Sequence, residues 1–388
     1  MNLLLKNIGT LISGDIEKPI LEADSIYVED GLIAEVGQGL NQPAEKVIDC
    51  QGTTVSPGLF DTHCHVVLGD FTPRQNQLGF IDSAHHGGVT TFISAGEVHL
   101  PGRPTDPAGA KALATLAYKS FQKFRPGGAK VLAGALILEK GLTENDFAEL
   151  AKEGLCLVGE VGLGSVKNPE DAAPMVAWAK KHGFKVMMHT GGTSIPGSST
   201  ITAEMVMAID PDIVSHINGG PTAVSPDEIR KLVNQTSYWL ELVHCGNNKA
   251  ANIALAEAAK ADALGRFLIG NDAPSGTGVV SLGILRMVTH VASLGGVAAE
   301  KALAMATGNP AKAFGLNRGL IAKGREADLV VMDAPMGSYG QDALSAMTEG
   351  DIPGVSLVIV DGKITVNTSR NTPPATKKPV LAARATPS

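Results

Sequence analysis

The chain has 388 residues, of which 44% are hydrophobic and 18% are charged, and its formal net charge is −7 at pH 7. This length suits one large barrel with a smaller appendage, and the negative charge argues against nucleic acid or an anionic membrane as a partner. No apolar run reaches the ~20 residues that cross a bilayer, and we expect no signal peptide in the opening M-N-L-L-L-K. The four cysteines lack metal-binding spacing, so we expect reduced core thiols in a cytoplasmic protein.

Both ends of the chain predict short antiparallel strands. Residues 1–56 alternate apolar and polar positions around a turn at Asp30-Gly31, and 323–371 repeat the pattern in A-D-L-V-V-M-D and L-V-I-V-D-G-K-I-T-V. We therefore expect the two segments to form one discontinuous β-sandwich domain. Residues 372–388 are rich in proline and charge, which predicts an extended or disordered tail.

The middle of the chain, 57–322, alternates apolar strand-like runs with helical segments. The helix starts are readable, as in Ser225-Pro226-Asp227-Glu228, which combines a cap, a first-turn proline and a capping-box glutamate. Continuously apolar strands are typical of a parallel sheet buried on both faces. The pattern predicts eight βα units and hence a (β/α)8 TIM-type barrel, with strands at G-L-F-D-T-H-C-H, T-T-F-I-S-A, A-K-V-L-A-G-A-L-I-L, C-L-V-G-E-V-G, K-V-M-M-H, D-I-V-S-H, Y-W-L-E-L-V-H and R-F-L-I-G-N-D.

Histidines and carboxylates end several of these strands. His63 and His65 are two residues apart in the first strand, so they point to one side while Cys64 points to the other. Further polar residues end later strands at intervals of 27 to 29 residues, and the active sites of such barrels lie at this carboxyl rim. The later residues are Glu160, His189, His216, His244 and Asp272.

Imidazole and carboxylate groups together suit zinc, iron, manganese or cobalt. A site for two divalent metals needs about this many ligands and one shared carboxylate, and a remaining carboxylate can transfer protons. Taken singly, each residue has a structural alternative: His189 or His216 capping a turn, Glu160 paired with a basic residue, and Asp272 capping a helix. Their recurrence on five strand ends favours the metal site, because buried polar groups are costly unless paired or coordinated.

The pattern resembles the amidohydrolase superfamily, which has His-x-His after strand 1, a bridging lysine or glutamate after strand 4, histidines after strands 5 and 6, and an aspartate after strand 8. The lead-in V-S-P-G-L-F-D-T-H-C-H and the late T-G-N-P-A-K-A-F-G-L are also typical of it. The resemblance implies that Glu160 bridges two metals and that Asp272 also carries protons. The implied ligands are His63, His65 and Asp272 for one metal, and His189 and His216 for the other.

At two positions the sequence differs from particular branches of this superfamily. Glu160 stands where hydantoinases and dihydroorotases have a carboxylated lysine, and the run H-T-G-G-T after His189 lacks the helper glutamate of many deaminases. The runs V-G-E-V-G-L-G, M-H-T-G-G-T-S and S-H-I-N-G-G-P-T are most similar to a member that acts in nicotinate degradation. This similarity implies hydrolysis of a small anionic cyclic amide, 6-oxo-1,4,5,6-tetrahydronicotinate, to 2-formylglutarate and ammonia. It also implies a homo-oligomer, either a dimer or a tetramer.

Further rim residues are candidates for substrate contact. Arg103, in the loop after the second strand, offers a cation for an anionic substrate, and its alternative is a solvated loop arginine. The other candidates are His244, Asn218, Asn247 and Thr193. For His244 the alternative is a histidine that caps a turn. Alternative functions are a hydantoinase- or dihydroorotase-like, N-acyl or dipeptide hydrolase, or a non-catalytic metal-binding barrel. The filled ligand positions disfavour the last of these.

Overall fold

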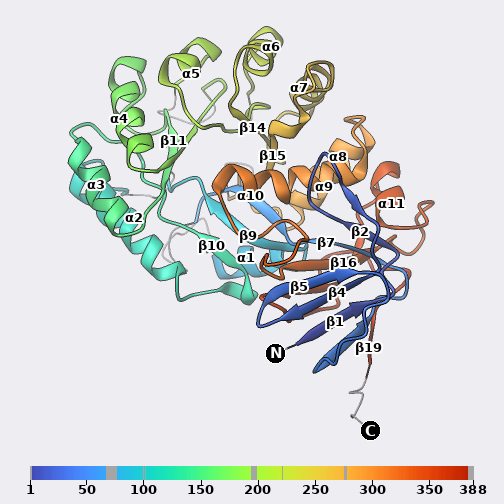
Figure 1. Cartoon of the computed structure of the whole chain (residues 1–388). Helices are drawn as coiled ribbons and strands as arrows, with labels where there is room; N and C mark the ends of the chain where they lie inside the picture. Colours follow the sequence, from blue (N-terminus) through green and yellow to red (C-terminus); the bar gives the residue numbers. More distant parts are fainter. Residues whose placement is uncertain are drawn as a thin grey trace.

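The computed structural model describes residues 2–66, 77–98, 100, 102–193, 199–220, 222–274 and 278–382. Eight parallel strands form a barrel, helices α2 to α7 form an arc outside it, and two further sheets lie at one side (Figure 1). In the described part of the chain, no helix has both the length and the apolar character that a membrane crossing requires.

The barrel consists of a three-stranded and a five-stranded parallel sheet that meet at both edges. Parallel bridges join Cys64 to Ala273 and Leu136 to Val158 and thereby close the ring. All eight predicted strands are present, which confirms the TIM-type barrel. Their bounds are β8 (Leu59–Cys64), β9 (Val89–Ser94), β10 (Lys130–Leu132), β11 (Leu157–Val161), β12 (Lys185–Met188), β13 (Ile213–Val214), β14 (Trp239–Val243) and β15 (Phe267–Gly270).

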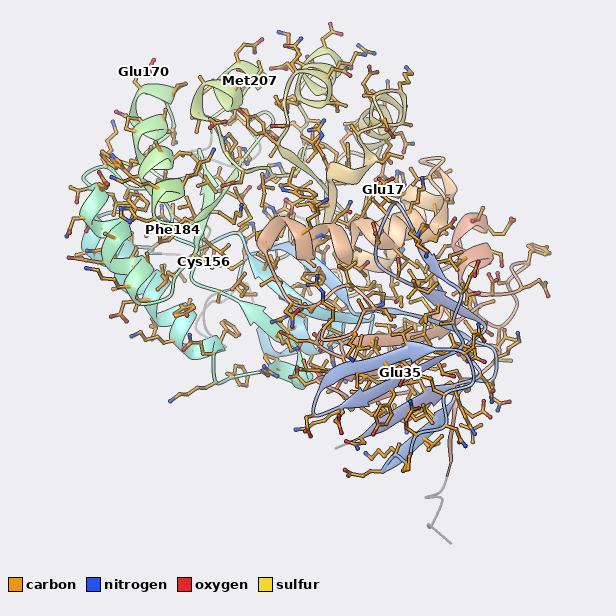
Figure 2. The ribbon with its side chains drawn as sticks, viewed as in Figure 1. Glu17, Glu35, Cys156, Glu170, Phe184 and Met207 are labelled. Carbon is orange, nitrogen blue, oxygen red and sulfur yellow. The ribbon has the colours of Figure 1, made fainter. Side chains whose placement is uncertain are left out.

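Helices cover the outside of the barrel because alternate strand residues, such as Leu240 and Leu242 on β14, are apolar and buried against them. The predicted start of one helix is confirmed: Ser225 and Glu228 form a capping box ahead of α6. Charged side chains such as Glu170 on α4 lie at the periphery (Figure 2). The helices are α1 (Gln77–His85), α2 (Pro107–Phe121), α3 (Glu144–Lys152), α4 (Pro169–Lys181), α5 (Ala203–Ile209), α6 (Pro226–Gln235), α7 (Asn248–Lys260), α8 (Gly283–Ser293), α9 (Ala299–Met305), α10 (Gly308–Phe314) and α11 (Ala343–Glu349), with 3-10 turns at Pro126–Gly128 and Leu264–Arg266.

Strands from both chain ends form two sheets that share one hydrophobic core, in which Leu5 and Ile26 of the first sheet join Val331 and Leu357 of the second. The predicted Asp30-Gly31 turn joins β4 to β5, and both of its residues have positive φ, as a tight hairpin requires. The first sheet has the order β19 (Val380–Ala382), β6 (Lys46–Asp49), β1 (Leu3–Lys6), β4 (Ser25–Glu29) and β5 (Leu32–Gly37). The second has the order β18 (Lys363–Asn367), β17 (Gly354–Val360), β16 (Leu329–Asp333), β7 (Thr54–Pro57), β2 (Thr10–Ile12) and β3 (Ile20–Leu21).

The carboxyl-terminal segment differs from the sequence prediction, which placed 372–388 outside the terminal sheets. Within this segment Ala375 forms an isolated bridge with Pro335, and β19 pairs antiparallel with β6, with Val380 opposite Asp49. The pairing satisfies backbone groups of β6 that would otherwise form an open sheet edge. Residues 383–388 lie outside the described part of the chain.

A buried lysine joins the barrel to the terminal sheets. Lys130, at the start of β10, has a side chain only 6% exposed, and its Nζ lies 2.6 Å from Glu326 Oε2, 2.8 Å from Asp328 Oδ2 and 2.6 Å from Asp361 Oδ1. These three carboxylates come close enough to hold a metal ion. The lysine ammonium already compensates them, so they form a structural ion cluster and not a second metal centre.

Replacing Lys130 with methionine is expected to lower the free energy of unfolding by about 3 kcal/mol, because it leaves buried carboxylates without their cation. The midpoint of urea-induced unfolding measures the effect. Lys119→Met is the matched control, since Lys119 and Glu153 are both about half exposed and their pair should contribute less than ~1 kcal/mol. Equal shifts for the two variants would contradict a special role for Lys130.

Candidate functional site

Two histidines of β8 converge on the mouth of the barrel. His63 and His65 are fully buried, and their ring centroids are 5.2 Å apart. Cys64 points the other way, into the core between strands and helices, where its Sγ lies 3.2 Å from the carbonyl oxygen of Ile93. The alternation of side chains along a strand therefore places both imidazoles at one site.

Glu160, at the end of β11, lies between two pairs of histidines. Its Oε2 is 3.5 Å from Nε2 of His63 and 3.5 Å from Nε2 of His65. Its Oε1 is 2.6 Å from Nε2 of His216 and 3.5 Å from Nδ1 of His189. One carboxylate thus directs each of its oxygens at a different histidine pair.

Asp272 follows β15 and completes the group on the His65 side. Its Oδ1 is 3.2 Å from Nε2 of His65 and 3.7 Å from Nε2 of His63. Its backbone N–H donates to the carbonyl oxygen of His63 at 2.8 Å, which ties the end of β15 to β8. The Asp272 side chain is 11% exposed, whereas the histidines and Glu160 are 0% to 6% exposed, so Asp272 is the most accessible member of the group.

The rear nitrogens of the β8 histidines are hydrogen-bonded. Nδ1 of His65 lies 2.6 Å from the carbonyl oxygen of Gly96, and Nδ1 of His63 lies 2.7 Å from Oε2 of Glu241. Glu241, a fully buried residue of β14, is not among the predicted site residues. The available signal was a carboxylate between two leucines in W-L-E-L-V, where a buried charge requires a partner.

The electrostatics keep both carboxylates of the group anionic. Burial would raise the pKa of Glu160, but the charges of His63 and His216 outweigh it and hold that pKa well below its usual value. Burial likewise opposes ionisation of Asp272, and its hydrogen bond with His65 lowers the pKa of Asp272 overall. For His63 burial lowers the pKa, but Glu241 and Glu160 raise it well above its usual value. In the metal-free site the histidines therefore compensate the two carboxylates, and a metal cation bound there would take over that role.

These residues fit a metal centre. Ligand atoms of His63, His65 and Glu160 all lie within 4.8 Å of one another, and so do those of Glu160, His189 and His216. Within the described residues, the buried Nε2 of His63 has no hydrogen-bond partner, although it faces the carboxylates of the site. A nitrogen left unpaired in this way is costly unless it binds a metal ion, for which imidazole and carboxylate are suitable ligands.

The two asparagines among the five candidate substrate contacts bond to backbone groups at the rim. The side-chain amide of Asn218 is buried and pairs with the backbone N–H and C=O of Val243, both at 2.9 Å. Asn247 caps α7, accepting from the N–H of Ala250 at 3.0 Å. Both amides therefore position backbone at the rim, and their contact with substrate stays a prediction. Thr193 is exposed in the loop after β12.

The two cationic candidates, Arg103 and His244, have neighbours that affect their charge, and their contact with substrate stays a prediction. Nη1 of Arg103 lies 2.6 Å from Oε1 of Glu139, a buried carboxylate, so a neighbouring loop already neutralises its charge. His244 is half-buried; burial lowers its pKa, and Arg286 and His290 of α8 lower it further. The positive surroundings disfavour the charged form of His244.

The sequence profile of the Amidohydrolase family matches residues 54–365, and the chain belongs to this family. The resemblance inferred from the strand ends is thereby confirmed. Enamidase of Eubacterium barkeri is 58% identical over 375 residues, which cover 96% of this chain and 97% of that protein. A crystal structure of enamidase, described as a new member of the amidohydrolase superfamily, matches with a TM-score of 0.96 and 56% identity and covers 98% of this chain and 100% of that one.

More distant relatives share the fold. The 5-methylthioadenosine/S-adenosylhomocysteine deaminase of Pyrococcus furiosus is 26% identical over alignments covering 94% of this chain and 97% of that protein. A β-aspartyl dipeptidase from Fervidobacterium islandicum AW-1 matches with a TM-score of 0.66 at 19% identity, covering 95% of this chain and 97% of that one. Such low identity shows the common architecture and leaves the substrate open.

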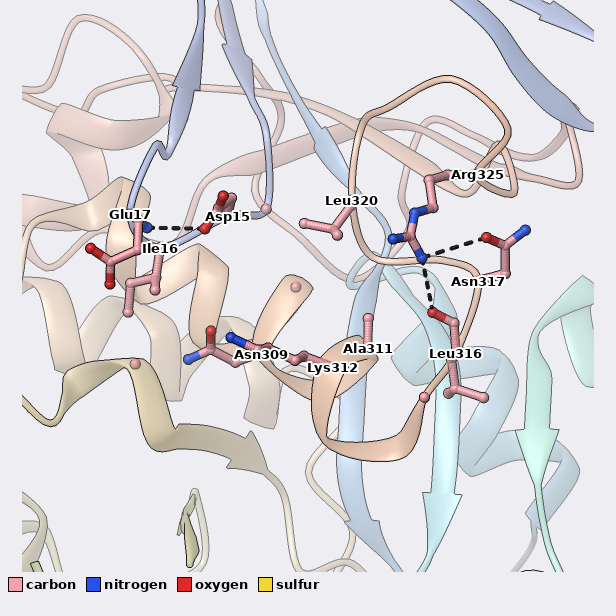
Figure 3. A pocket seen from close by; sticks show the side chains of 14 residues that line it. Asp15, Ile16, Glu17, Asn309, Ala311, Lys312, Leu316, Asn317, Leu320 and Arg325 are labelled. Atoms are coloured by element: carbon pink, nitrogen blue, oxygen red, sulfur yellow. Dashed lines mark hydrogen bonds between the residues drawn. The ribbon is translucent and has the colours of Figure 1, made fainter. Parts of the chain in front are cut away.

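A cavity of about 590 Å³ lies between the loop that holds Glu17 and helix α10 (Figure 3). It is lined by Glu17 of the terminal sheets, by Lys312 of α10 and by Gly265, which precedes β15. Gly265 is at the amino end of its barrel strand, whereas the histidine–carboxylate group is at the carboxyl ends. Because active sites of this fold lie at the carboxyl ends, the cavity is separate from the chemistry of the histidine–carboxylate group.

Proposed function

We propose that the protein is a binuclear amidohydrolase with enamidase activity. It would open the cyclic amide of 6-oxo-1,4,5,6-tetrahydronicotinate and hydrolyse the resulting enamine to 2-formylglutarate and ammonia. The observation that carries this proposal is Glu160, whose two oxygens face separate histidine pairs. The substrate is supported by 58% identity to an enamidase across nearly the whole chain.

The proposed ligand sets follow the distances. His63, His65 and Asp272 form one half of the site, His189 and His216 form the other, and Glu160 is shared. Zinc or iron suits these nitrogen and oxygen ligands. When bound, the metals would polarise the amide carbonyl and lower the pKa of a water molecule.

Asp272 carries the proton in this scheme. As an anion at the accessible edge of the group, it accepts a proton from the attacking water and returns it to the ring nitrogen. The carbonyl carbon–nitrogen bond breaks as the carbon–oxygen bond forms, which yields a carboxylate and an enamine. The enamine tautomerises to an imine, and a second water converts the imine to the aldehyde with loss of ammonia.

Release of ammonia from 6-oxo-1,4,5,6-tetrahydronicotinate tests the proposal, with metal content measured on the same sample. We expect release together with about two metal ions per chain. Two metals without release would overturn the substrate and leave the metal centre, so other cyclic amides would be tested next. Absence of metal, with no activity after zinc or iron is added, would overturn the whole proposal.

Removal of the metals with a chelator is expected to abolish ammonia release, because no side chain of the group alone activates water at neutral pH. Adding back zinc or iron should restore the activity. Mass spectrometry of metal content and the ammonia assay are followed together during both steps. Full activity in verified metal-free protein would contradict the role proposed for the histidines.

We also propose that the two terminal sheets form a single β-sandwich domain, 1–56 with 323–371, attached to the barrel at 57–322. Their shared core supports this division, as does the passage from β7 to β8 near residue 57. The strand β19 adds 380–382 to the same unit.

A further inference from the structure

Glu241 is a buried carboxylate in the middle of a barrel strand. Its side chain is fully buried, and Leu240 and Leu242 on either side pack into the core beneath the helices. Its Oε1 accepts from the hydroxyl of Thr62 at 2.5 Å, and its Oε2 lies 2.7 Å from Nδ1 of His63. Within the described residues, no lysine or arginine forms an ion pair with it. A buried carboxylate is costly unless another group compensates it, and the group that lies against Glu241 is His63.

The contact with Glu241 determines which nitrogen of His63 carries the proton. A carboxylate accepts hydrogen bonds and cannot donate them, so Nδ1 of His63 must be the N–H donor. When the ring gives up its second proton to bind a metal, the lone pair lies on Nε2, the nitrogen that faces Glu160 and Asp272 and lacks a hydrogen-bond partner among the described residues. Hydrogen bonding of this kind fixes the ring orientation and makes the free nitrogen more basic.

The four histidines of the site are not supported equally. Nδ1 of His65 has a neutral carbonyl partner, from Gly96, at 2.6 Å. The rear nitrogens of the other pair, Nε2 of His189 and Nδ1 of His216, are buried without a hydrogen-bond partner in the described part of the chain. Among the described residues, the half with His63 therefore has a carboxylate behind a ligand and the half with His189 and His216 does not, so the two halves differ.

We propose that Glu241 is a positioning residue that holds His63 ready to bind metal and makes the half of the site containing His63, His65 and Asp272 the tighter one. This inference rests on the binuclear site proposed above. Among the described residues, the side chain of Glu241 bonds to Thr62 and His63 and not to His189 or His216, so its effect should be confined to one of two metal ions.

The test is a chelator titration of the metal-loaded protein, with metal ions per chain counted by mass spectrometry. Glu241→Gln is expected to release one of the two ions at about 10- to 100-fold lower chelator concentration than wild type, while release of the other ion is unchanged. Thr62→Val is the matched control, because it removes the second hydrogen bond to Glu241 but leaves the carboxylate on His63. In the control, the chelator concentration that releases the same ion should change much less.

The outcomes separate this inference from the function on which it rests. Coincident curves for Glu241→Gln and wild type, or an equal shift of both ions, would overturn the positioning role, since a general structural defect would loosen both halves. Wild-type protein that binds no metal would overturn the proposed function itself. If Glu241→Gln does not fold, Glu241→Asp replaces it, because the shorter side chain keeps the charge but withdraws it from His63. This variant should lower the chelator concentration that releases the same ion by a smaller factor.

Discussion

Replacing Asp272 with asparagine is expected to lower kcat for ammonia release by about 10²- to 10⁴-fold, because the variant loses the group that moves the proton from water to nitrogen. The backbone at this position has φ of 59°, in the left-handed region that asparagine adopts readily, so the local fold should be kept. Steady-state kinetics on protein of measured metal content separates a loss of proton transfer from a loss of metal.

Asp262→Asn provides a matched control for this variant. Asp262 also has positive φ, at 52°, but it is exposed just after α7. It precedes the amino end of β15, whereas the metal-site histidines lie at the carboxyl ends of the barrel strands. Its activity should equal that of wild type. If Asp272→Asn retained its metals and turned over within about threefold of wild type, another group would have to carry the proton.

Replacing Glu160 with glutamine is expected to reduce the metal content from about two ions per chain to one or none. Each oxygen of Glu160 faces a different histidine pair, and the NH2 group of glutamine is a donor that cannot serve as a ligand. Loss of a hydrogen-bond partner behind a metal ligand already lowers metal affinity or activity about 10- to 100-fold. Loss of the shared ligand itself should therefore lower kcat at least ~10²-fold. Metal analysis and the ammonia assay on the same preparation measure both effects.

Glu139→Gln is the control for Glu160, since Glu139 is another fully buried carboxylate at the rim that pairs with Arg103 and contacts none of the four histidines in the described structure. Its metal content should equal that of wild type. Two tightly held metals in Glu160→Gln would show that the histidine pairs bind them without a shared carboxylate.

The barrel and the histidine–carboxylate group could be predicted because both follow from local order along the chain. Each strand is a short apolar run, and the residue that ends it must lie at the rim once the strands are parallel. His63 and His65 then share a face by the alternation of a strand. Glu160, His189 and His216 join them because every one of these residues ends a strand of the same barrel.

The partners of rim residues could not be predicted in this way. Arg103 pairs with Glu139 and Asn218 bonds to Val243, the last residue of β14, because segments from separate βα units pack together. The sequence shows only that each residue lies near a strand end. Glu241 was missed for a related reason. It ends no strand, and its partner His63 is 178 residues away in the chain. A pattern of neighbouring residues cannot predict a contact over such a separation.

The pairing of β7 with β16 and of β6 with β19 has a consequence for the order of folding during synthesis. On the ribosome the amino-terminal strands emerge first, but these partners are made only after the whole barrel. The nascent sheets must therefore hold open edges while the barrel forms, and such edges readily pair with other chains. The β6 edge of the first sheet is covered by β19, whose residues follow the barrel in the chain. Synthesis at low temperature, or with chaperones that bind exposed strand edges, should therefore favour the native product.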